Sequence, residues 1–511
     1  MKYFFSILII ITLSVSSYGQ DLTDSIYFYQ QSQKDAEVLF LNATNLNSSG
    51  IYKAGIAGFQ YQNTKGHFRR AQEAESKKVL KIATSGIATL GKFKTSGYFN
   101  FSRVYQDSLS WTTKGTEIDA QPYYFASSKA GEFERTLYDF GGILSYDLIK
   151  DKLSIASGLE YKFSSSTRSV DPRPSVQNAL LILKPELIFR TNGHSIGLQA
   201  LWGYGKERFS LVFKNRDFGA SLGYPDRINY IIYGYGLIEN MQSPQNTVRN
   251  ERYKGAALNY ATNFTSGNLK ATIGYKQWHD DNSFRTINSI TNNLIGTFIL
   301  DEITGNILAN HVGSEHMHQI SVNVLSASGQ DKQVLYNSTN YRYDHQTLDA
   351  EYLIRFHHQR KKTLELGASL NYDKLEKQDI VSAHYVQNTK VEPGLSAGMY
   401  FKNQNKDLFS VYLAGGYIIP FNGGISVAPL QETVFTRGVI YPNYTYDSSK
   451  AVRLSGKLNY ISSSLFKEFK TGFSVQASYL SVAQLGEQFS NATFLPSKGR
   501  LNLNLAVNLY F

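Results

Sequence analysis

Apolar and polar residues alternate along many stretches of this chain, and this alternation limits what it can fold into. In the last eleven residues, 501–511, every odd position is apolar, and Asn occupies three of the five even positions. A period of two residues places all the apolar side chains on one face of a β-strand. The same pattern recurs in several other runs, at 153–163, 196–204, 269–275, 348–357, 364–373 and 452–460.

These runs are long for strands of a soluble protein. They approach the roughly 9–11 residues with which a tilted strand crosses a membrane, whereas soluble strands most often have about 5–6. Several end in Tyr, Trp or Phe, as expected of side chains at a membrane interface. An array of soluble β-sandwiches would also alternate, but no Pro- or Ser-rich linker divides the chain into pieces of that size. We therefore predict an all-β chain that forms a transmembrane antiparallel up-and-down β-barrel.

The composition agrees with a membrane barrel and excludes several chemistries. The 511 residues include no Cys, which excludes disulfides, Cys-ligated zinc, a Cys nucleophile and a lipid-anchored N-terminal Cys. Charged residues make up only 18% of the chain, below the roughly 25% of soluble domains. The formal net charge of +11 is spread along the chain. We therefore expect phosphate groups of lipopolysaccharide and membrane lipid as partners, and no nucleic acid.

The N-terminus has the features of an export signal. Lys2 is followed by the apolar stretch 4–15, which is too short to span a bilayer, and then by the small residues Ser17 and Gly19 around Tyr18. We interpret residues 1–19 as a signal peptide and Gln20 as the mature start. An anchor helix is the alternative, disfavoured because polar residues follow at once. Export with a barrel fold predicts location in the outer membrane of a Gram-negative cell.

Short polar turns between the alternating runs give the strand count. Seven hairpins contribute fourteen strands, and runs at 51–61 and 501–511 bring the number to sixteen. An even number places both ends in the periplasm, with short periplasmic turns and long extracellular loops. The segment 281–346 contains Ile320, Val322 and Val324, which form either a hairpin above the membrane or two further spanning strands, so the range is 14–18. The turns lie near 91–92, 150–152, 192–193, 266–268, 359–362, 403–406 and 463–467, and the loops at 63–77, 107–133, 164–177, 207–249, 281–346, 376–390, 420–449 and 485–498.

Residues 20–50 precede the barrel domain, which we assign to 51–511. They contain a compact apolar stretch at 37–42, followed by Asn45, Leu46 and Asn47. Two interpretations stay open. The segment forms a short helix in the periplasmic mouth of the barrel, or it is a frayed terminal tail.

Three features together resemble a known family. The terminal Phe511, the segment 42–47 and the loop 168–174, which contains Asp171-Pro172-Arg173-Pro174, are similar to an uncharacterised outer-membrane β-barrel family of Gram-negative bacteria. That family is defined by a domain of unknown function, so the resemblance implies the fold and no catalytic or binding residue. The Asp-Pro-Arg-Pro loop also has a structural interpretation, because proline restricts its own backbone and that of the residue before it.

Matches to catalytic motifs are weak. Two Gly-x-Ser-x-Gly sequences occur at 219–223 and 394–398, but a loop and an alternating strand lack the strand, turn and helix that a nucleophile elbow needs. Residues 278–281 (Trp-His-Asp-Asp) place an acid beside a His without a partner motif. No phosphate-binding loop or dinucleotide fingerprint is present. We therefore predict no enzymatic activity and no cofactor.

Histidines near residue 315 are candidates for a metal site. His311, Glu315, His316 and His318 lie close together in sequence and are residue types that hold transition metals. His316 and His318 share a face only in an extended segment, and no supporting residues are recognisable. We interpret the group as a solvated strand or loop and predict no metal site.

The strand faces give a functional hypothesis. A barrel of sixteen to eighteen strands can enclose an aqueous lumen, and a surplus of cations at a constriction favours anionic solutes. We predict a channel or transporter for small, possibly anionic solutes. The alternative is a scaffold or receptor with a filled lumen that acts with a surface lipoprotein, a transporter or a secretion partner. The lumen-lining candidates are Lys162, Lys270, Lys276, Arg355, Arg453 and Lys457, and Leu509 and Phe511 are the expected signal for the barrel assembly machinery.

Overall fold

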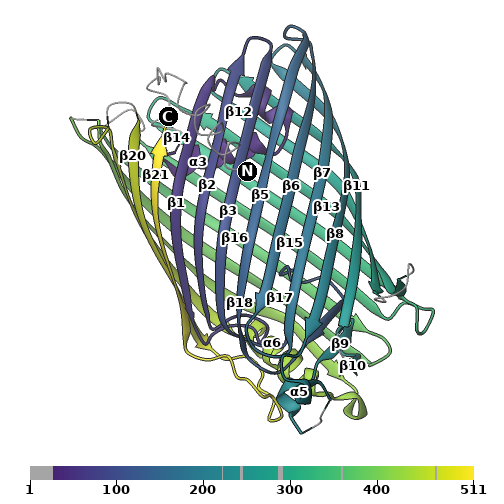
Figure 1. Cartoon of the computed structure of the whole chain (residues 1–511). Coiled ribbons are helices and arrows are strands. Elements are labelled where there is room, and N and C mark those ends of the chain that lie inside the picture. The colour runs from purple at the N-terminus through teal and green to yellow at the C-terminus, as the bar shows by residue number, and fades with distance from the viewer. Residues whose placement is uncertain are drawn as a thin grey trace.

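Eighteen antiparallel strands form one closed sheet in the computed structural model of this chain (Figure 1). The structure describes residues 27–511 except 221–222, 242–244, 286–291, 358–360, 405 and 467–468, so the expected signal peptide 1–19 and the mature start at Gln20 lie outside the described residues. Each strand pairs with its neighbour along the barrel, and β1 pairs with β21 to close the sheet. The first nine barrel strands are β1 (Lys53–Gly66), β2 (Ser76–Leu90), β3 (Phe93–Leu109), β5 (Gly131–Ile149), β6 (Leu153–Arg168), β7 (Arg173–Thr191), β8 (His194–Val212), β11 (Gln245–Phe264) and β12 (Gly267–Phe284). The other nine are β13 (Asn293–Val312), β14 (His316–Gln333), β15 (Tyr341–Phe356), β16 (Lys362–Asp379), β17 (His384–Lys402), β18 (Leu408–Val427), β19 (Lys450–Ser462), β20 (Lys470–Gln484) and β21 (Gly499–Tyr510).

The barrel confirms the predicted fold class, and its eighteen strands lie at the upper end of the predicted range of 14–18. The two strands beyond the sixteen counted from the turns are β13 and β14, which lie within the segment 281–346 and pair along most of their length. This segment therefore contains two spanning strands joined by a short turn, and is not one long loop. Two other expected loops shrink for a similar reason, because the strands run further than expected: 164–177 reduces to residues 169–172, and 376–390 to residues 380–383.

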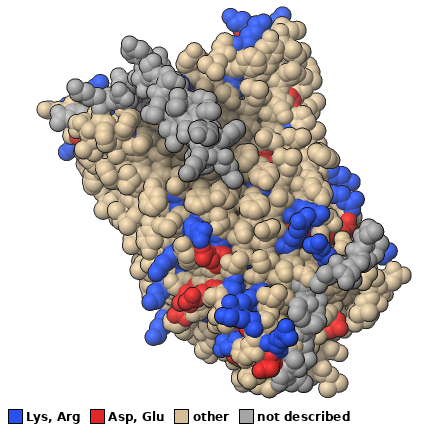
Figure 2. Space-filling model, in the orientation of Figure 1, with Lys and Arg blue, Asp and Glu red and all other residues tan. Residues whose placement is uncertain are grey.

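The two ends of the barrel differ. The short turns lie at the end where the C-terminus and the first described helix are found, and the long connections lie at the other end (Figure 1). This arrangement matches short periplasmic turns and long extracellular loops. Outward-facing apolar side chains such as Leu395 (73% exposed), Trp202 (61%) and Leu413 (60%) provide the lipid-facing surface. Figure 2 shows few charged side chains across a broad belt of the visible face.

No helix among the described residues has the length and apolar character to cross a bilayer.

Loops at the extracellular end fold into the barrel. We call the described residues of 67–75, 110–130, 213–241, 428–449 and 485–498 the loop layer. It contains a three-stranded sheet of β4 (Tyr123–Ala126), β9 (Tyr230–Tyr233) and β10 (Ile238–Asn240). Its helices are α5 (Arg216–Ala220), η2 (Pro225–Arg227), η3 (Pro429–Gln431), η4 (Thr436–Ile440) and α6 (Tyr441–Asp447). The layer packs Trp111, Phe435 and Ile440 against inward-facing wall residues such as Phe298 and Tyr341. The largest hydrophobic core of the protein therefore lies inside the barrel at this end.

A second element occupies the periplasmic mouth. Residues 27–49, which we call the N-terminal segment, form α3 (Gln30–Glu37), η1 (Val38–Phe40) and α4 (Ala43–Ser48). Leu39 and Leu46 are buried against Ile87, Ile143 and Ile188 on the inner wall. Of the two interpretations that the sequence left open, the structure has the helix in the mouth.

Candidate functional site

The inner wall of the barrel holds the N-terminal segment through a buried carboxylate on β7. Glu186 is only 5% exposed and accepts hydrogen bonds from the backbone N–H groups of Ala43 (2.8 Å) and Thr44 (3.3 Å) at the start of α4. The Thr44 hydroxyl and the Asn259 amide (2.9 Å) also donate to it. Asn42 caps the same helix end and donates onward to Asn259. A carboxylate at the first turn of a helix satisfies its free N–H groups, so Glu186 fixes α4 to the wall.

Polar contacts fix α3 to the neighbouring strands. Asp35 pairs with Lys270 of β12 (3.3 Å) and accepts from Asn310 of β13 (2.8 Å). Gln31 donates to the backbone carbonyls of Met317 and Leu353, on β14 and β15, at 3.0 and 3.1 Å. Lys34 forms an ion pair with Glu351 of β15. The inner faces of β7 and β11–β17, which we call the charged wall, therefore carry most of the polar attachments of the N-terminal segment.

The opposite side of the lumen has a different character. We call the inner faces of β19, β20, β21, β1, β2 and β3 the polar wall, and its central tract comprises residues 453–459, 474–480, 502–508, 58–64, 79–85 and 98–102. No Asp or Glu occurs anywhere in these six ranges. Their inward positions carry mainly amides and hydroxyls, with three cations. The inward set is Arg453, Ser455, Lys457, Asn459, Ser474, Gln476, Ser478, Asn502, Asn504, Asn508, Gln60, Gln62, Thr64, Lys81, Ser85, Asn100 and Ser102.

A cavity lies between part of the N-terminal segment and the polar wall, although other parts of the segment pack on that wall, such as Tyr27 against Tyr510 of β21 (5.3 Å between ring centroids). The cavity has a volume of about 480 Å³ and is lined on one side by Gln33, Glu37 and Phe40. On the other side it is lined by polar-wall residues such as Lys457 and Asn508. Most polar-wall amides and hydroxyls are half-buried, whereas the charged-wall residues that hold the segment, such as Glu186 and Asn259 (0% exposed), are buried. The segment therefore has its buried polar contacts mainly on the charged wall and leaves a cavity beside part of the polar wall.

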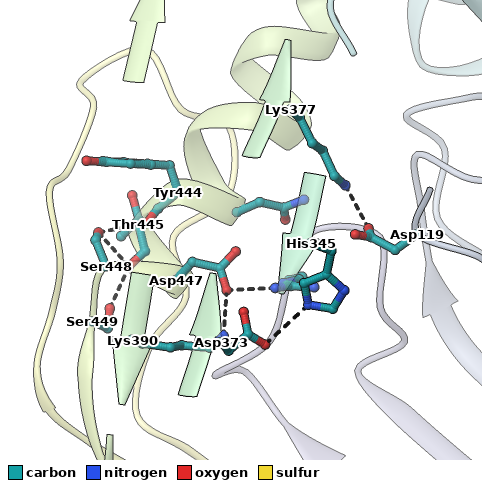
Figure 3. A network of polar contacts seen from close by, with 12 residues as sticks. Asp119, His345, Asp373, Lys377, Lys390, Tyr444, Thr445, Asp447, Ser448 and Ser449 are labelled. Atoms are coloured by element: carbon teal, nitrogen blue, oxygen red, sulfur yellow. Dashed lines mark hydrogen bonds and ion pairs between the residues drawn. The ribbon is translucent and has the colours of Figure 1, made fainter. Parts of the chain in front are cut away.

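Besides its aromatic core, the loop layer has charged contacts at the outer end, and Figure 3 shows the network around Asp447 and Asp119. Asp447, at the end of α6, pairs with Arg70 of the loop layer (2.7 Å) and with Lys390 of β17 (3.4 Å). Asp119 of the loop 110–130 pairs with Lys377 of β16 at 2.8 Å. The pairs with Lys390 and Lys377 join loops to the charged wall, and the pair of Arg70 with Asp447 joins two loops to each other, so the closure is a set of discrete contacts between separate segments.

These ion pairs shift the pKa values of their members in the loop layer. Asp447 raises the pKa of the Arg70 guanidinium above its usual value, against the opposing effect of burial. Burial by itself would raise the pKa of Asp119, but Lys377 and Arg70 hold it below the usual range. Both shifts favour the charged forms, which stabilises the ion pairs at neutral pH.

A second cavity lies within the loop layer. It has a volume of about 730 Å³ and is open to the exterior. Its lining combines the rings of Trp111, Tyr230 and Phe494 with the guanidinium groups of Arg69 and Arg437. It is formed by the connections β1–β2, β3–β5, β8–β11, β18–β19 and β20–β21, so four of its five loops lie next to strands of the polar wall.

The six lumen-lining candidates from the sequence lie at inward strand positions, and most have partners. Lys270 contacts Asp35 of the N-terminal segment, and Arg355 lies over the Tyr29 ring at 4.1 Å. Lys276 pairs with Glu302, and Arg453 pairs with Glu392 at 2.7 Å. Lys457 lines the cavity beside the N-terminal segment. Lys162 is exposed and lies near Glu160, which pairs with Lys184.

The structure places the residues of the other sequence motifs at separate positions in the strands. In 278–281, Trp278 and Asp280 point inward and are buried, and His279 pairs with Asp281 (3.0 Å). Asp280 is in a buried cluster with Arg249 at 3.8 Å. Ser396, of the motif 394–398, lies within β17, and 219–223 falls partly outside the described residues. Among the residues that the structure places, no group of three or more His, Asp or Glu is arranged to hold a metal ion.

The candidate histidines lie at a different place from the one expected. His311 ends β13 and His316 and His318 begin β14, so they flank a short turn at the periplasmic end and are not in an extracellular loop. His318 contacts the hydroxyl of Tyr352 at 2.7 Å, and His316 packs against Phe356. These contacts fit a strand end near the membrane interface.

The Asp-Pro-Arg-Pro loop has a structural role. Asp171 accepts hydrogen bonds from the backbone N–H groups of Lys214 (3.1 Å) and Asn215 (3.0 Å) and pairs with Arg173 (2.8 Å). Burial alone would raise the pKa of Asp171, but these donors hold it below its usual value. The loop therefore anchors the start of the β8–β11 connection.

Sequence reasoning missed several residues of the interior. Glu186 and Asp447 gave no motif because their partners are far away in sequence, and Arg69 gave none because most of the residues that share its cavity are also far away in sequence. A signal for the polar wall was present in the regular Asn spacing of residues 502–508. This spacing indicates a polar inner surface only together with the neighbouring strands β1 and β20, which also contain no acid.

A closed antiparallel barrel with an apolar outer surface and a polar interior is an outer-membrane β-barrel protein. The family model described as a family of unknown function, DUF6850, matches residues 43–511, and the chain belongs to this family. The match begins at Ala43, the first residue of α4, and therefore includes the helix that Glu186 holds. The resemblance drawn from the sequence is confirmed. No curated protein matches the chain.

Solved structures with a similar fold include outer-membrane receptors. The siderophore receptor PiuA from Acinetobacter baumannii is 7% identical, with a TM-score of 0.35, over 90% of this chain and 82% of PiuA. The ferric-catecholate import receptor Fiu from E. coli K12, in its open form, is 10% identical, with a TM-score of 0.37, over 91% of this chain and 82% of Fiu. At these values the likeness concerns the fold only.

Proposed function

We propose that the protein is an outer-membrane conduit for small hydrophilic solutes, with a preference for anions. The observation that carries this proposal is the polar wall, whose central tract has three inward cations and no carboxylate. A surface of amides and hydroxyls can exchange hydrogen bonds with a passing solute. Arg453 pairs with Glu392 of β17, but Lys81 and Lys457 have no ion pair among the described contacts, so the tract keeps a positive charge that favours anions. The solute would move from the loop layer along this wall to the cavity beside the N-terminal segment.

The position of the N-terminal segment supports a regulated conduit. Its buried polar contacts lie mainly on the charged wall, and the cavity of about 480 Å³ lies between it and the polar wall. At the mouth, Glu37 of the segment and Lys457 of the polar wall line the same cavity. Movement of a segment of this kind would widen the passage without breaking the sheet, because β1 and β21 close the barrel independently of it.

A receptor or scaffold is the second candidate function, and the loop layer favours it. Its aromatic core and ion pairs close the outer end of the lumen in this structure. A protein that only displayed its loops to a surface lipoprotein, transporter or secretion partner would have the same closed end. The two functions differ in whether current flows through the reconstituted barrel.

Conductance of the full chain in planar lipid bilayers tests the conduit. We expect a small current with a reversal potential on the anion side in a KCl gradient. The variant with Lys81, Arg453 and Lys457 all changed to Gln removes the cations of the central tract of the polar wall and should lose this preference. The control changes Lys78, Arg252 and Lys254 to Gln, three exposed cations at outward positions, and should keep it.

Three results would contradict the conduit. They are the absence of current both in the full chain and in a variant without residues 27–49, a cation preference, and an anion preference that the polar-wall variant retains. The first of these would favour the receptor or scaffold function.

A further inference from the structure

The cavity of the loop layer contains a cation that the protein leaves poorly compensated. Arg69 is 6% exposed and donates from Nη1 to the backbone carbonyls of Arg70 (3.2 Å) and Glu73 (2.7 Å). Its Nε is buried without a hydrogen-bond partner, and no described carboxylate lies within ion-pair distance of it. Burial and the neighbouring Arg500 lower the pKa of Arg69, partly opposed by Glu75 and Glu73. A buried donor without an acceptor is costly and indicates an absent partner.

A second guanidinium lies on the same cavity. The Arg437 side chain is 42% exposed, and its Nε is 3.7 Å from Glu432, a long and solvent-accessible pair. The only acid that lines the described part of the cavity is Asp226, which is already paired with Lys129 at 2.9 Å. The cavity therefore presents two arginines, and its one carboxylate is neutralised.

Aromatic rings form the apolar part of the cavity. The Arg69 guanidinium lies over the Phe494 ring at 4.6 Å, and Trp111 stacks with Tyr230 at 6.5 Å between ring centroids. Trp111 has a φ of 59°, in the left-handed region that bulky residues rarely adopt. Gly438 allows its close approach, because a Cβ there would lie 2.3 Å from the Trp111 ring. Strained residues held in this way concentrate at binding sites.

The lining segments are tied together. Thr493 donates its backbone N–H to Arg437 (3.0 Å), which joins the β20–β21 and β18–β19 connections, and Trp111 donates to Ser127 (2.7 Å). The volume of about 730 Å³ is in the range of small-molecule sites, about 300–1,000 Å³. The cavity is thus a built site in which charge and ring surfaces converge.

We propose that this cavity binds a small organic anion that carries a planar ring. Its carboxylate, sulfonate or phosphate group lies between Arg69 and Arg437, and its ring packs against Trp111, Tyr230 and Phe494. Arginine suits this role because its planar group binds oxyanions through two donors and also stacks on rings. The inference rests on the proposed function in one respect, since the bound anion would be the solute that enters the conduit.

Equilibrium dialysis tests the proposal on the full chain in lipid nanodiscs, with empty nanodiscs to subtract partitioning into lipid. The probes are 2-naphthoate and its neutral analogue 2-naphthamide, which share the ring and differ in charge. We expect naphthoate to bind about tenfold more tightly, equivalent to about 1.4 kcal/mol. Arg437→Gln and Arg69→Gln should each reduce this preference to about twofold or less, and Arg252→Gln, which removes an exposed outward cation, should retain it.

Three other results of this experiment would contradict the binding proposal. Equal binding of the two probes, binding of neither, or an unchanged preference in Arg437→Gln would exclude an anion site in this cavity. Arg437→Gln is informative even if Arg69→Gln disturbs its loop, because Arg437 is half-exposed. The outcome is separable from that of the conduit. Binding of naphthoate without current would support the anion site and contradict the conduit. Anion-selective current without a naphthoate preference would support the conduit and contradict the anion site.

Discussion

The charged wall and the polar wall are built from the same kind of strand, yet their inner faces are used in opposite ways. On the charged wall, acids such as Glu186 and Glu351 are committed to the N-terminal segment. On the polar wall, the central tract has no acid, and most of its amides are half-buried and accessible from the lumen. One side therefore holds a filling element in place, and the other leaves room beside it.

The difference between the two walls shows how an element can occupy a wide barrel and still leave open space along one side of the lumen. Directional contacts to buried charges fix a segment in one position, because an unpaired buried charge is costly. Amides and hydroxyls that face water exchange partners at little cost. Placing the two kinds of surface opposite each other gives the interior a fixed side and a permissive side.

Removal of the N-terminal segment gives the largest expected effect on this comparison. Deletion of residues 27–49 should raise the single-channel conductance about threefold, because barrels of this strand number enclose an aqueous lumen. The increase is limited to this size because the loop layer stays in place at the outer end. The measurement is single-channel recording in planar bilayers. Circular dichroism and heat-modifiable gel mobility check that the barrel has folded.

The same deletion should keep the anion preference, since the polar wall is unchanged. An unaltered conductance would mean that the N-terminal segment does not limit the passage. A change in selectivity would mean that the segment, and not the polar wall, determines charge preference.

Neutralising the carboxylate that holds α4 is the next test. Glu186→Gln keeps the shape but replaces charge-assisted hydrogen bonds to Ala43 and Thr44 with weaker ones, so docking of α4 should lose about 2–3 kcal/mol. Hydrogen exchange of the backbone amides of residues 43–48 measures this loss directly. Glu302→Gln is the matched control, because Glu302 pairs with Lys276 on the same wall and has no contact with the segment among the described interactions. If residues 43–48 are equally protected from hydrogen exchange in Glu186→Gln and in the wild type, Glu186 does not anchor α4.

Alternation in the sequence predicted the barrel because the pattern reflects one physical contrast, lipid outside and polar interior. The pattern weakens where that contrast fails. In β13, outward Ile299 and Ile303 alternate with Phe298 and Leu300, which point inward into the core with the loop layer. Apolar residues on both faces remove the period of two, and this is why the segment 281–346 did not resolve into two spanning strands.

The interior was less predictable than the wall, for a related reason. The stretch 37–47 left a helix in the mouth and a frayed tail both open, because its partner Glu186 is 142 residues from Thr44 and is the only acid in β7. The six cations predicted to line the lumen are at inward positions, yet the sequence did not indicate which of them have partners. Inward folding of the loops depends on contacts such as Arg70 with Asp447, whose residues lie 377 positions apart.

Breaking the outer ion pairs tests the closure above the charged wall. Asp447→Asn leaves Arg70 and Lys390 without their shared carboxylate, and should weaken packing of 428–449 by about 1–2 kcal/mol because both cations are partly solvated. Hydrogen exchange of α6 measures this change. Protection of α4 in the same experiment should stay unchanged, since the two closures share no contact among the described residues. Simultaneous loosening of α4 would show that the two ends are coupled.

The most local expected effect is a pH dependence confined to the loop layer. Lys114 lies over the Tyr124 ring at 3.9 Å and donates to the carbonyl of Ile118 (3.1 Å). Burial lowers the pKa of Lys114 to about 7 from 10.5, with Asp119 and Glu207 raising it and Lys377 and Arg249 lowering it further. Between these two pH values the docked loop binds fewer protons than the undocked loop. Docking of residues 110–130 should therefore strengthen as the pH rises from about 7 and stay constant below it, with a slope of at most about 1.4 kcal/mol per pH unit.

Hydrogen exchange of residues 110–130 between pH 6 and 9.5, corrected for the intrinsic exchange rate, measures this slope. Lys114→Met keeps the apolar part of the side chain and removes the titrating group, so its slope should vanish and its protection at pH 7 should exceed that of the wild type. The cations of the polar wall provide the contrast, because Lys81→Gln should leave the slope unchanged. A slope that persists in Lys114→Met would assign the titration to another group and would leave Lys114 as a packed aliphatic side chain with a solvated ammonium group.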